Sequence, residues 1–120
     1  MGRALRLLLV EDHADSAELM AEILESHGHQ VAVALSASAA LELAKTQVFD
    51  LVVSDVGLPD ASGYDLMQQL REMQSVKGIA ITGSTGEEVE KRGRAAGFSA
   101  HLTKPVTMRR LEQVINEVCV

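Results

Sequence analysis

Five short apolar runs recur along the chain, each followed by a longer stretch of mixed polarity. The runs lie at 5–10, 30–34, 51–53, 78–82 and 100–103, and most of their residues are aliphatic. Runs of this length that are rich in branched aliphatic side chains predict buried β-strands. The run at 51–53 has no polar alternation, which is typical of a strand covered on both faces in a parallel sheet. The run at 30–34 alternates weakly and predicts a shorter strand at a sheet edge.

The stretches after these runs carry apolar residues at intervals of three and four, which predicts a helix in each. We expect Asp12 or Asp15 to cap the first helix, Gly28 to end it, and Ser36 or Ser38 to begin the second. The predicted inner faces are Leu19, Met20, Ile23, Leu24 and His27 in the first helix; Ala40, Leu41 and Ala44 in the second; Leu66, Met67, Leu70 and Met73 in the third, opened by Ser62 or Gly63; Val89 and Ala96 in the fourth; and Leu111, Val114, Ile115 and Val118 in the last.

The alternation of strands with helices predicts an α/β fold of the (βα)5 type. Such folds have a parallel sheet with helices on both faces and right-handed crossovers. The length of 120 residues fits one domain spanning 1–120. The helix over 87–96 is expected to be the weakest, because its apolar face is narrow and Gly93 inside it costs about 1 kcal/mol relative to alanine.

Charge and composition limit the class of partner. The net charge of −6 argues against a nucleic-acid surface on this domain. Cys119 is the only cysteine, so no internal disulfide can form, and a reducing cytoplasm is the expected location. No apolar run approaches the ~20 residues of a membrane span, so we expect no membrane contact by this domain.

Polar side chains follow four of the five predicted strands. Glu11 and Asp12 come after the first, Asp55 closes the third, Thr82 closes the fourth and Lys104 follows the fifth. Parallel strands end at one edge of their sheet, where ligands bind in open α/β folds. Taken singly, each residue has an ordinary explanation: the acids as helix caps, the hydroxyl as a strand end and the lysine as a solvated loop residue. Their joint occurrence indicates a site.

The chemistry of this set suits a divalent cation and an anion. Three carboxylates at one edge repel each other unless a cation lies between them. An oxygen-only cluster suits Mg²⁺, which binds a few carboxylates and keeps waters and phosphate oxygens as further ligands. Lys104 can neutralise an anion that the metal orients, and Thr82 can donate a hydrogen bond to it.

With these residues in place, the chain resembles the receiver domain of two-component response regulators. The resemblance covers nearly the whole chain and rests on five motifs: Leu7-Leu8-Leu9-Val10-Glu11-Asp12, Asp50-Leu51-Val52-Val53-Ser54-Asp55, Leu58-Pro59-Asp60 with Gly63, Ala96-Gly97-Phe98, and Leu102-Thr103-Lys104-Pro105. It implies a flavodoxin-like, doubly wound sheet with strand order 2-1-3-4-5.

The resemblance also implies the role of each site residue. Asp55 would be the phosphoacceptor that attacks phosphohistidine on a partner kinase, with Lys104 and Thr82 contacting phosphoryl oxygens. Phosphoryl transfer needs little beyond in-line positioning and charge stabilisation. The implied metal is Mg²⁺, with Mn²⁺ as an alternative. Its ligands would be Glu11, Asp12, Asp55 and the backbone carbonyl of Gly57, while Pro59 would turn the chain and Pro105 would fix a cis Lys104-Pro105 bond.

A switch is implied as well. Phosphorylation would draw Thr82 inward, and His101 would rotate to fill the space, repacking the surface formed by the helix over 87–96, the strand over 100–103 and the last helix. That surface is a candidate homodimer interface. The chain departs from the family at His101, where Tyr or Phe is usual. One hypothesis is that His101 makes the switch pH-sensitive; the alternative is a plain polar substitute.

Several alternatives remain open from sequence. A haloacid-dehalogenase-like phosphatase would need a second Asp where Gly57 stands. A flavodoxin would place Ser, Thr and Gly after the first strand, and a degenerate receiver would serve only as a docking module. Whether the domain counts as an enzyme is left open, because a phosphoacceptor assists only its own phosphorylation and dephosphorylation.

The kind of receiver is also open. The motifs at 54–60 and 97–105 look most like receivers of hybrid sensor histidine kinases, and a stand-alone response regulator is the alternative. The expected partners are the dimerisation and phosphotransfer domain of a histidine kinase, or a separate phosphotransfer protein. They would dock on the first helix, with Ala14, Ala17 and Met20 as candidate contacts.

Overall fold

The five strands form one parallel sheet in the order β2-β1-β3-β4-β5. A computed structural model of the chain describes residues 4–119. Its elements are β1 (Arg6–Val10), α1 (Ala14–Ser26), β2 (Gln30–Ala34), α2 (Ala37–Thr46), β3 (Leu51–Asp55), α3 (Gly63–Met73), β4 (Lys77–Thr82), α4 (Glu87–Ala96), β5 (Ala100–Thr103) and α5 (Met108–Val118). The predicted fold class, strand order and edge position of β2 are confirmed.

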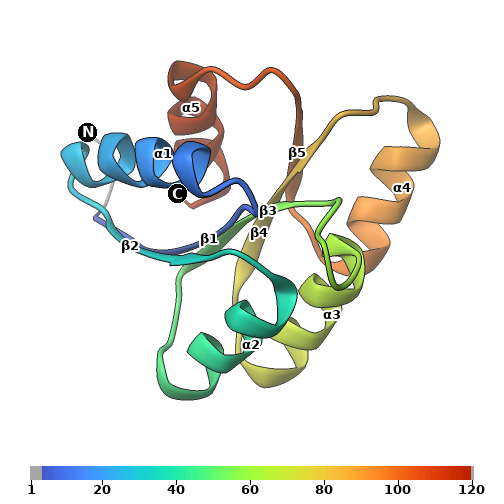
Figure 1. The fold of residues 1–120 in the computed structure, drawn as a ribbon. Coiled ribbons are helices and arrows are strands. Elements are labelled where there is room, and N and C mark those ends of the chain that lie inside the picture. Colours follow the sequence, from blue (N-terminus) through green and yellow to red (C-terminus); the bar gives the residue numbers. More distant parts are fainter. Residues whose placement is uncertain (1–3, 120) are drawn as a thin grey trace.

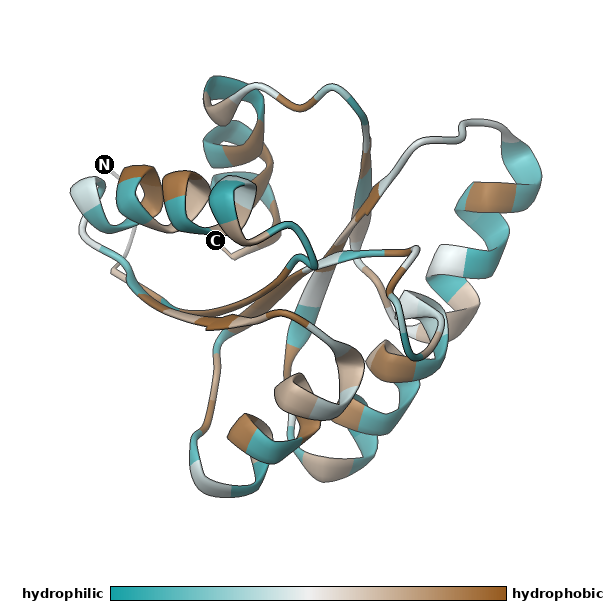
Figure 2. Cartoon of the chain, in the orientation of Figure 1, coloured by the Kyte–Doolittle hydropathy of each residue, from teal (hydrophilic) through white to brown (hydrophobic). Residues whose placement is uncertain are grey.

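The helices cover both faces of the sheet. Helices α1 and α5 lie on one face, and α2, α3 and α4 lie on the other (Figure 1). Along β1, Leu7 and Leu9 belong to the core under α1 and α5, whereas Leu8 and Val10 belong to the core on the opposite face. Figure 2 shows the resulting pattern, with apolar residues along the strands and mixed polarity along the helices. Burial on both faces explains why β3 reads as a continuous apolar run.

Side-chain caps begin two of the helices as predicted. The Ser36 hydroxyl accepts a hydrogen bond from the Ala39 amide at 3.1 Å, at the start of α2. The Ser62 hydroxyl accepts from the Tyr64 amide at 3.1 Å, at the start of α3. Each bond satisfies an amide that has no partner within its own helix.

The predicted cap of α1 is wrong. His13 is the cap residue, in an extended conformation and without a side-chain capping bond. Asp12 therefore lies one residue before the cap, and Asp15 lies within the first turn of the helix. Gly28 follows the helix end with φ of +94°, in the left-handed region that glycine tolerates, as the sequence predicts.

Three residues assigned to inner helix faces are exposed. Leu19 in α1 is 60% exposed, Met73 at the end of α3 is 42% exposed, and His27 follows the end of α1. The buried stripe of α1 is instead Ala17, Ala21 and Leu24, which is narrower than the apolar pattern of that stretch. The spacing of apolar residues predicts a broad buried face for α1, but the contact between the helix and the sheet buries only part of that face.

His29 is a buried side chain that the sequence analysis missed. Its Nδ1 accepts a hydrogen bond from the Leu5 amide at 3.2 Å, so the ring proton lies on Nε2, which donates to Glu112 Oε1 at 2.9 Å. From its place just before β2, the ring thus connects the residue before β1 to helix α5. A histidine beside a glycine-ended helix carries no sequence signal for such a role.

We expect His29→Ala to destabilise the fold by about 2–4 kcal/mol, because it removes a buried ring and leaves the Leu5 amide without an acceptor. Urea unfolding followed by circular dichroism measures the change. The exposed His27 offers the matched control, and His27→Ala is expected to change the free energy of unfolding by less than about 0.5 kcal/mol. Equal effects of the two substitutions would contradict the structural role of His29.

Candidate functional site

The polar residues singled out at the strand ends lie together at one edge of the sheet. Val10 pairs with Ser54 across β1 and β3, and Asp55 pairs with Ile81 across β3 and β4. Thr82 pairs with Thr103 across β4 and β5. The register therefore places Glu11, Asp55, Thr82 and Lys104 at the carboxyl ends of four neighbouring strands (Figure 1).

Asp55 is the most buried carboxylate of this edge. Its side chain is 3% exposed, and Lys104 Nζ lies 2.9 Å from Oδ1 in an ion pair. Oδ2 has no hydrogen-bond partner among residues 4–119. A buried oxygen without a partner costs free energy, and in a native protein it indicates a place where an ion, water or ligand binds.

The start of α3 packs closely beneath Asp55. A side chain at Gly63 would collide with the carbonyl oxygen of Asp55, so only glycine allows this approach. The Gly63 amide donates to the Val56 carbonyl at 2.7 Å, and the Ser54 hydroxyl donates to the Asp55 carbonyl at 2.9 Å. These contacts fix the backbone that carries the Asp55 carboxylate.

The electrostatics of the edge follow from burial and from mutual repulsion. Burial, followed by the neighbouring Glu11 carboxyl, raises the pKa of Asp55 to about 6, although Lys104 opposes this shift. Burial also disfavours the charged form of Glu11, but its contacts with Asp55 and His13 prevail and hold the pKa of Glu11 below its ordinary value. The Asp55 carboxylate in turn raises the pKa of Lys104. Without a metal, one proton is thus retained more readily on Asp55 than on Glu11.

An acidic cluster lies beside Asp55 at the end of β1. Glu11 is buried, Asp12 is half-buried, and one ligand atom from each of Glu11, Asp12 and His13 lies within 4.8 Å of the others. Glu11 Oε1 accepts a hydrogen bond from the His13 amide at 3.0 Å and lies 2.9 Å from His13 Nδ1. His13 was not among the predicted site residues, because a histidine before a helix is common.

The two predicted switch residues lie in different surroundings. Thr82 is buried at the end of β4, and its hydroxyl accepts a hydrogen bond from the Ser84 amide at 3.0 Å. His101 is half-buried on β5 and lines a groove against α4 with Glu90 and Arg94. Thr82 therefore belongs to the strand-end edge, and His101 belongs to the face of the sheet beneath α4.

The two prolines and Asp60 shape the loops of the edge. The Lys104-Pro105 bond is cis, as the resemblance implies, and Pro59 is exposed in the loop after β3. The sequence analysis did not assign a role to Asp60. Its carboxylate accepts from the Ala37 and Ser38 amides at 2.9 and 3.0 Å, so it caps α2 from a neighbouring loop. These hydrogen bonds lower the pKa of Asp60.

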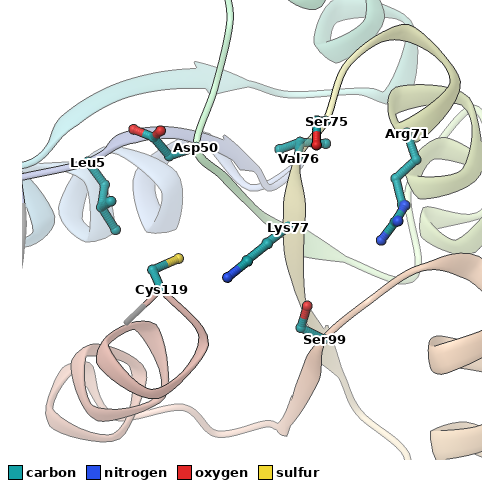
Figure 3. Close-up of a pocket in the computed structure, with 8 residues that line it drawn as sticks. All are labelled: Leu5, Asp50, Arg71, Ser75, Val76, Lys77, Ser99 and Cys119. Carbon is teal, nitrogen blue, oxygen red and sulfur yellow. The ribbon is translucent and has the colours of Figure 1, made fainter.

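A second cleft lies at the opposite end of the sheet. Figure 3 shows its lining residues, among them Asp50, Arg71 and Lys77. Its cations already have partners, since Lys77 Nζ donates to the Val118 carbonyl at 2.8 Å and Arg71 donates to the Gly97 carbonyl at 3.2 Å. Those bonds connect α5 to β4 and α3 to the end of α4. We therefore place the candidate site at the Asp55 edge.

Comparison with known proteins decides the family. The family model of the response regulator receiver domain matches residues 7–116. The chain belongs to this family. An uncharacterized 14.6 kDa protein of Leptolyngbya boryana is 34% identical over 94% of this chain and 88% of its own length. The receiver domain protein (CheY-like) of Methanospirillum hungatei, 30% identical, superposes with a TM-score of 0.89 over 96% of this chain and 93% of that chain.

Other relatives are much longer than this receiver. The sensor histidine kinase AruS of Pseudomonas aeruginosa is 35% identical over 96% of this chain but only 12% of its own length. The chain is therefore homologous to a module within a larger sensor kinase as well as to short receiver proteins. Membership of the receiver family replaces the phosphatase and flavodoxin alternatives. Within residues 4–119, no helix combines the length and apolarity needed to cross a membrane.

Proposed function

We propose that Asp55 of this two-component receiver accepts a phosphoryl group from a phosphohistidine of a partner histidine kinase. The observation that carries the proposal is the buried Asp55 carboxylate, with one oxygen beside Lys104 and the other without a hydrogen-bond partner among the described residues. In the reaction a carboxylate oxygen attacks phosphorus, a P–O bond forms, and the P–N bond to the kinase imidazole breaks. The imidazole departs with the electron pair and takes up a proton.

The residues around Asp55 fit a magnesium ion. The donors would be Glu11, Asp12, Asp55 and the backbone carbonyl of Gly57, all oxygen atoms of the kind that Mg²⁺ prefers, with Mn²⁺ as an alternative. When bound, the ion supplies positive charge that stabilises the oxygens of the transferred group. The buried, unpartnered oxygen of Asp55 gives such an ion a place among three carboxylates.

Lys104 and Thr82 would complete the site. The Lys104 ammonium now pairs with an oxygen of the Asp55 carboxylate. After phosphorylation it would pair with an oxygen of the phosphoryl group instead and stabilise its charge. Thr82 would exchange its present bond with the Ser84 amide for a hydrogen bond that its hydroxyl donates to the phosphoryl group. The loop after β4 would follow that movement and transmit it to α4.

The output surface proposed here is formed by α4, β5 and α5, and it is the candidate site of homodimerisation. The cap residue of helix α4 is Gly86, which offers no side-chain capping bond, and the helix contains Gly93, so it is a suitable element to shift. His101 lies in the groove between α4 and β5, where its rotation would alter the surface presented to a partner.

His101→Tyr tests whether the switch depends on protonation. The readout is the change in the rate of tryptic cleavage of α4 that phosphorylation causes. If the imidazole takes part, this change differs between pH 5.5 and pH 8 in the wild-type protein, by up to about 10-fold, and does not differ in His101→Tyr. His27→Tyr, at an exposed site beyond α1, is the matched control. The same pH response in both proteins would eliminate the hypothesis.

The partner is expected to dock beside the site on α1, through the exposed Ala14 and the half-buried Met20; Ala17, also proposed as a contact, is fully buried. We place the domain in the cytoplasm, as a receiver module of a hybrid sensor histidine kinase that receives phosphate from the kinase histidine or passes it to a phosphotransfer protein. A stand-alone response regulator and an unphosphorylated docking module are the alternatives.

Transfer of labelled phosphate from a phosphorylated histidine kinase domain to wild type but not to Asp55→Asn tests the proposal. No transfer from any donor would favour the docking module.

A further inference from the structure

The loop that follows Asp55 is tied to helix α2 by one side chain. This loop spans 57–62 and leads from β3 to α3, which lies beside α2 on the same face of the sheet (Figure 1). Asp60, near the middle of the loop, accepts hydrogen bonds from two successive amides at the start of α2. The distances are 2.9 Å from the Ala37 amide to Oδ1 and 3.0 Å from the Ser38 amide to Oδ2. Both carboxylate oxygens of Asp60 therefore bind an element that is distant in sequence.

The other contacts of this loop are of a different kind. Gly57 and Ser62 form an antiparallel bridge that joins its two ends. Between them, Leu58 and Ala61 are half-buried against the core on the α2 and α3 face of the sheet. Apolar contacts of this sort are non-directional, whereas a hydrogen bond weakens when its geometry changes. The two bonds of Asp60 therefore set where the middle of the loop lies relative to α2.

The same loop carries a backbone group of the proposed site. Gly57 stands two residues after Asp55, and its carbonyl is one of the oxygen donors that the proposed function gives to the metal. Gly57 is exposed, and a Cβ at this position would have no neighbouring atom within 4 Å. Packing around Gly57 itself therefore does not fix the direction of its carbonyl. That direction depends on how the rest of the loop is held, by the bridge to Ser62 and by the bonds of Asp60 to α2.

We propose that Asp60 is a positioning residue of the phosphorylation site, which holds the 57–62 loop on α2 and thereby keeps the Gly57 carbonyl in place for the divalent cation. The inference rests on the proposed function and deepens it by naming a residue that sets metal affinity without touching the metal. A ligand that is already held in place loses less conformational entropy when the ion binds. A carboxylate suits this role, because the amino end of a helix carries partial positive charge.

The test separates an effect on the loop from an effect on α2. Wild type is compared with Asp60→Ala, which removes both bonds, and with Asp60→Asn, which keeps one oxygen acceptor. Ser36→Ala is the matched control, because it removes the bond between the Ala39 amide and the Ser36 hydroxyl at the same end of α2 and leaves the bonds to the loop. Hydrogen–deuterium exchange of peptides covering 56–63 is measured on the metal-free proteins. Titration with Mn²⁺, followed by the electron paramagnetic resonance signal of the free ion, measures affinity, and circular dichroism checks that each variant is folded.

In Asp60→Ala we expect exchange in the loop to be at least about fivefold faster and Mn²⁺ affinity at least about fivefold weaker, with Asp60→Asn between this variant and wild type. Ser36→Ala is expected to change Mn²⁺ affinity by less than about twofold. Unchanged exchange or unchanged affinity in Asp60→Ala, or an equal loss of affinity in Ser36→Ala, would overturn the inference and leave the proposed function intact. Failure of wild type to bind Mn²⁺ would overturn the proposed metal site and the inference with it.

Discussion

Asp55→Asn is expected to stabilise the metal-free fold above pH 6 by about 1–3 kcal/mol, while abolishing phosphorylation. The stabilisation follows from the raised pKa of Asp55, about 6 in the fold against 3.8 in the unfolded chain. The protonated carboxyl is favoured by folding, so wild type loses stability as pH rises from about 4 through 6. Asparagine mimics the protonated form and avoids that loss. The lowered pKa of Glu11 acts with the opposite sign in wild type, because it adds stability as pH rises.

Urea unfolding between pH 4 and pH 8, in the presence of a chelator, measures this difference. The two proteins are expected to be equally stable near pH 4 and to diverge toward neutral pH. Added Mg²⁺ is expected to stabilise wild type and not Asp55→Asn, because ligand binding to the folded state stabilises it by mass action. Asp15→Asn, at an exposed position in α1, is the matched control and should change little. A variant less stable than wild type at pH 8 would contradict the account.

Lys104→Met is expected to slow phosphorylation of Asp55 by about 10²–10³-fold, the loss typical when one stabilising group is removed from a reacting anion. Methionine keeps most of the stem of lysine and removes the ammonium that lies 2.9 Å from Asp55 Oδ1. The variant is expected to fold, because Lys104 is 46% exposed. It also leaves Asp55 without its cation, so the pKa of Asp55 should rise further.

The rate of adduct formation with a small-molecule phosphodonor measures the effect of Lys104→Met. Lys91→Met in α4 offers the matched control, because it removes an exposed ammonium from another part of the chain. Its rate should stay within about twofold of wild type. A Lys104→Met protein that reacts as fast as wild type would show that the ammonium does not stabilise the transferred group.

The strand ends illustrate how much of the site was predictable from sequence. A parallel sheet places every strand end at one edge, so Glu11, Asp55, Thr82 and Lys104 follow from strand assignment alone. His13 does not, because its place beside Glu11 depends on the exact residue at which α1 begins. The sequence allowed Asp12 or Asp15 as the cap of α1, whereas the cap is His13, one residue after the first and two before the second. An error of this size is enough to miss the contact between His13 and Glu11.

Contacts between loops were equally hidden. Asp60 caps a helix more than twenty residues earlier in the chain, and His29 is held by the amide just before β1 and a carboxylate of α5. Local patterns carry no information on such contacts, because both partners must be placed in space first. The helix faces show the same limit, since Leu19 and Met73 fit the apolar spacing but lie outside the area that the sheet covers.

The most direct test of the central claim is to locate the phosphoryl group. Wild type and Asp55→Asn are treated with a small-molecule phosphodonor and Mg²⁺, and the acyl phosphate is reduced with borohydride, which converts a phosphorylated aspartate to homoserine. Tandem mass spectrometry of the peptides then reports the modified position. We predict modification at position 55 in wild type, dependent on the metal, and none in Asp55→Asn. Modification at another aspartate, or none at any position, would contradict the assignment of Asp55 as the phosphoacceptor.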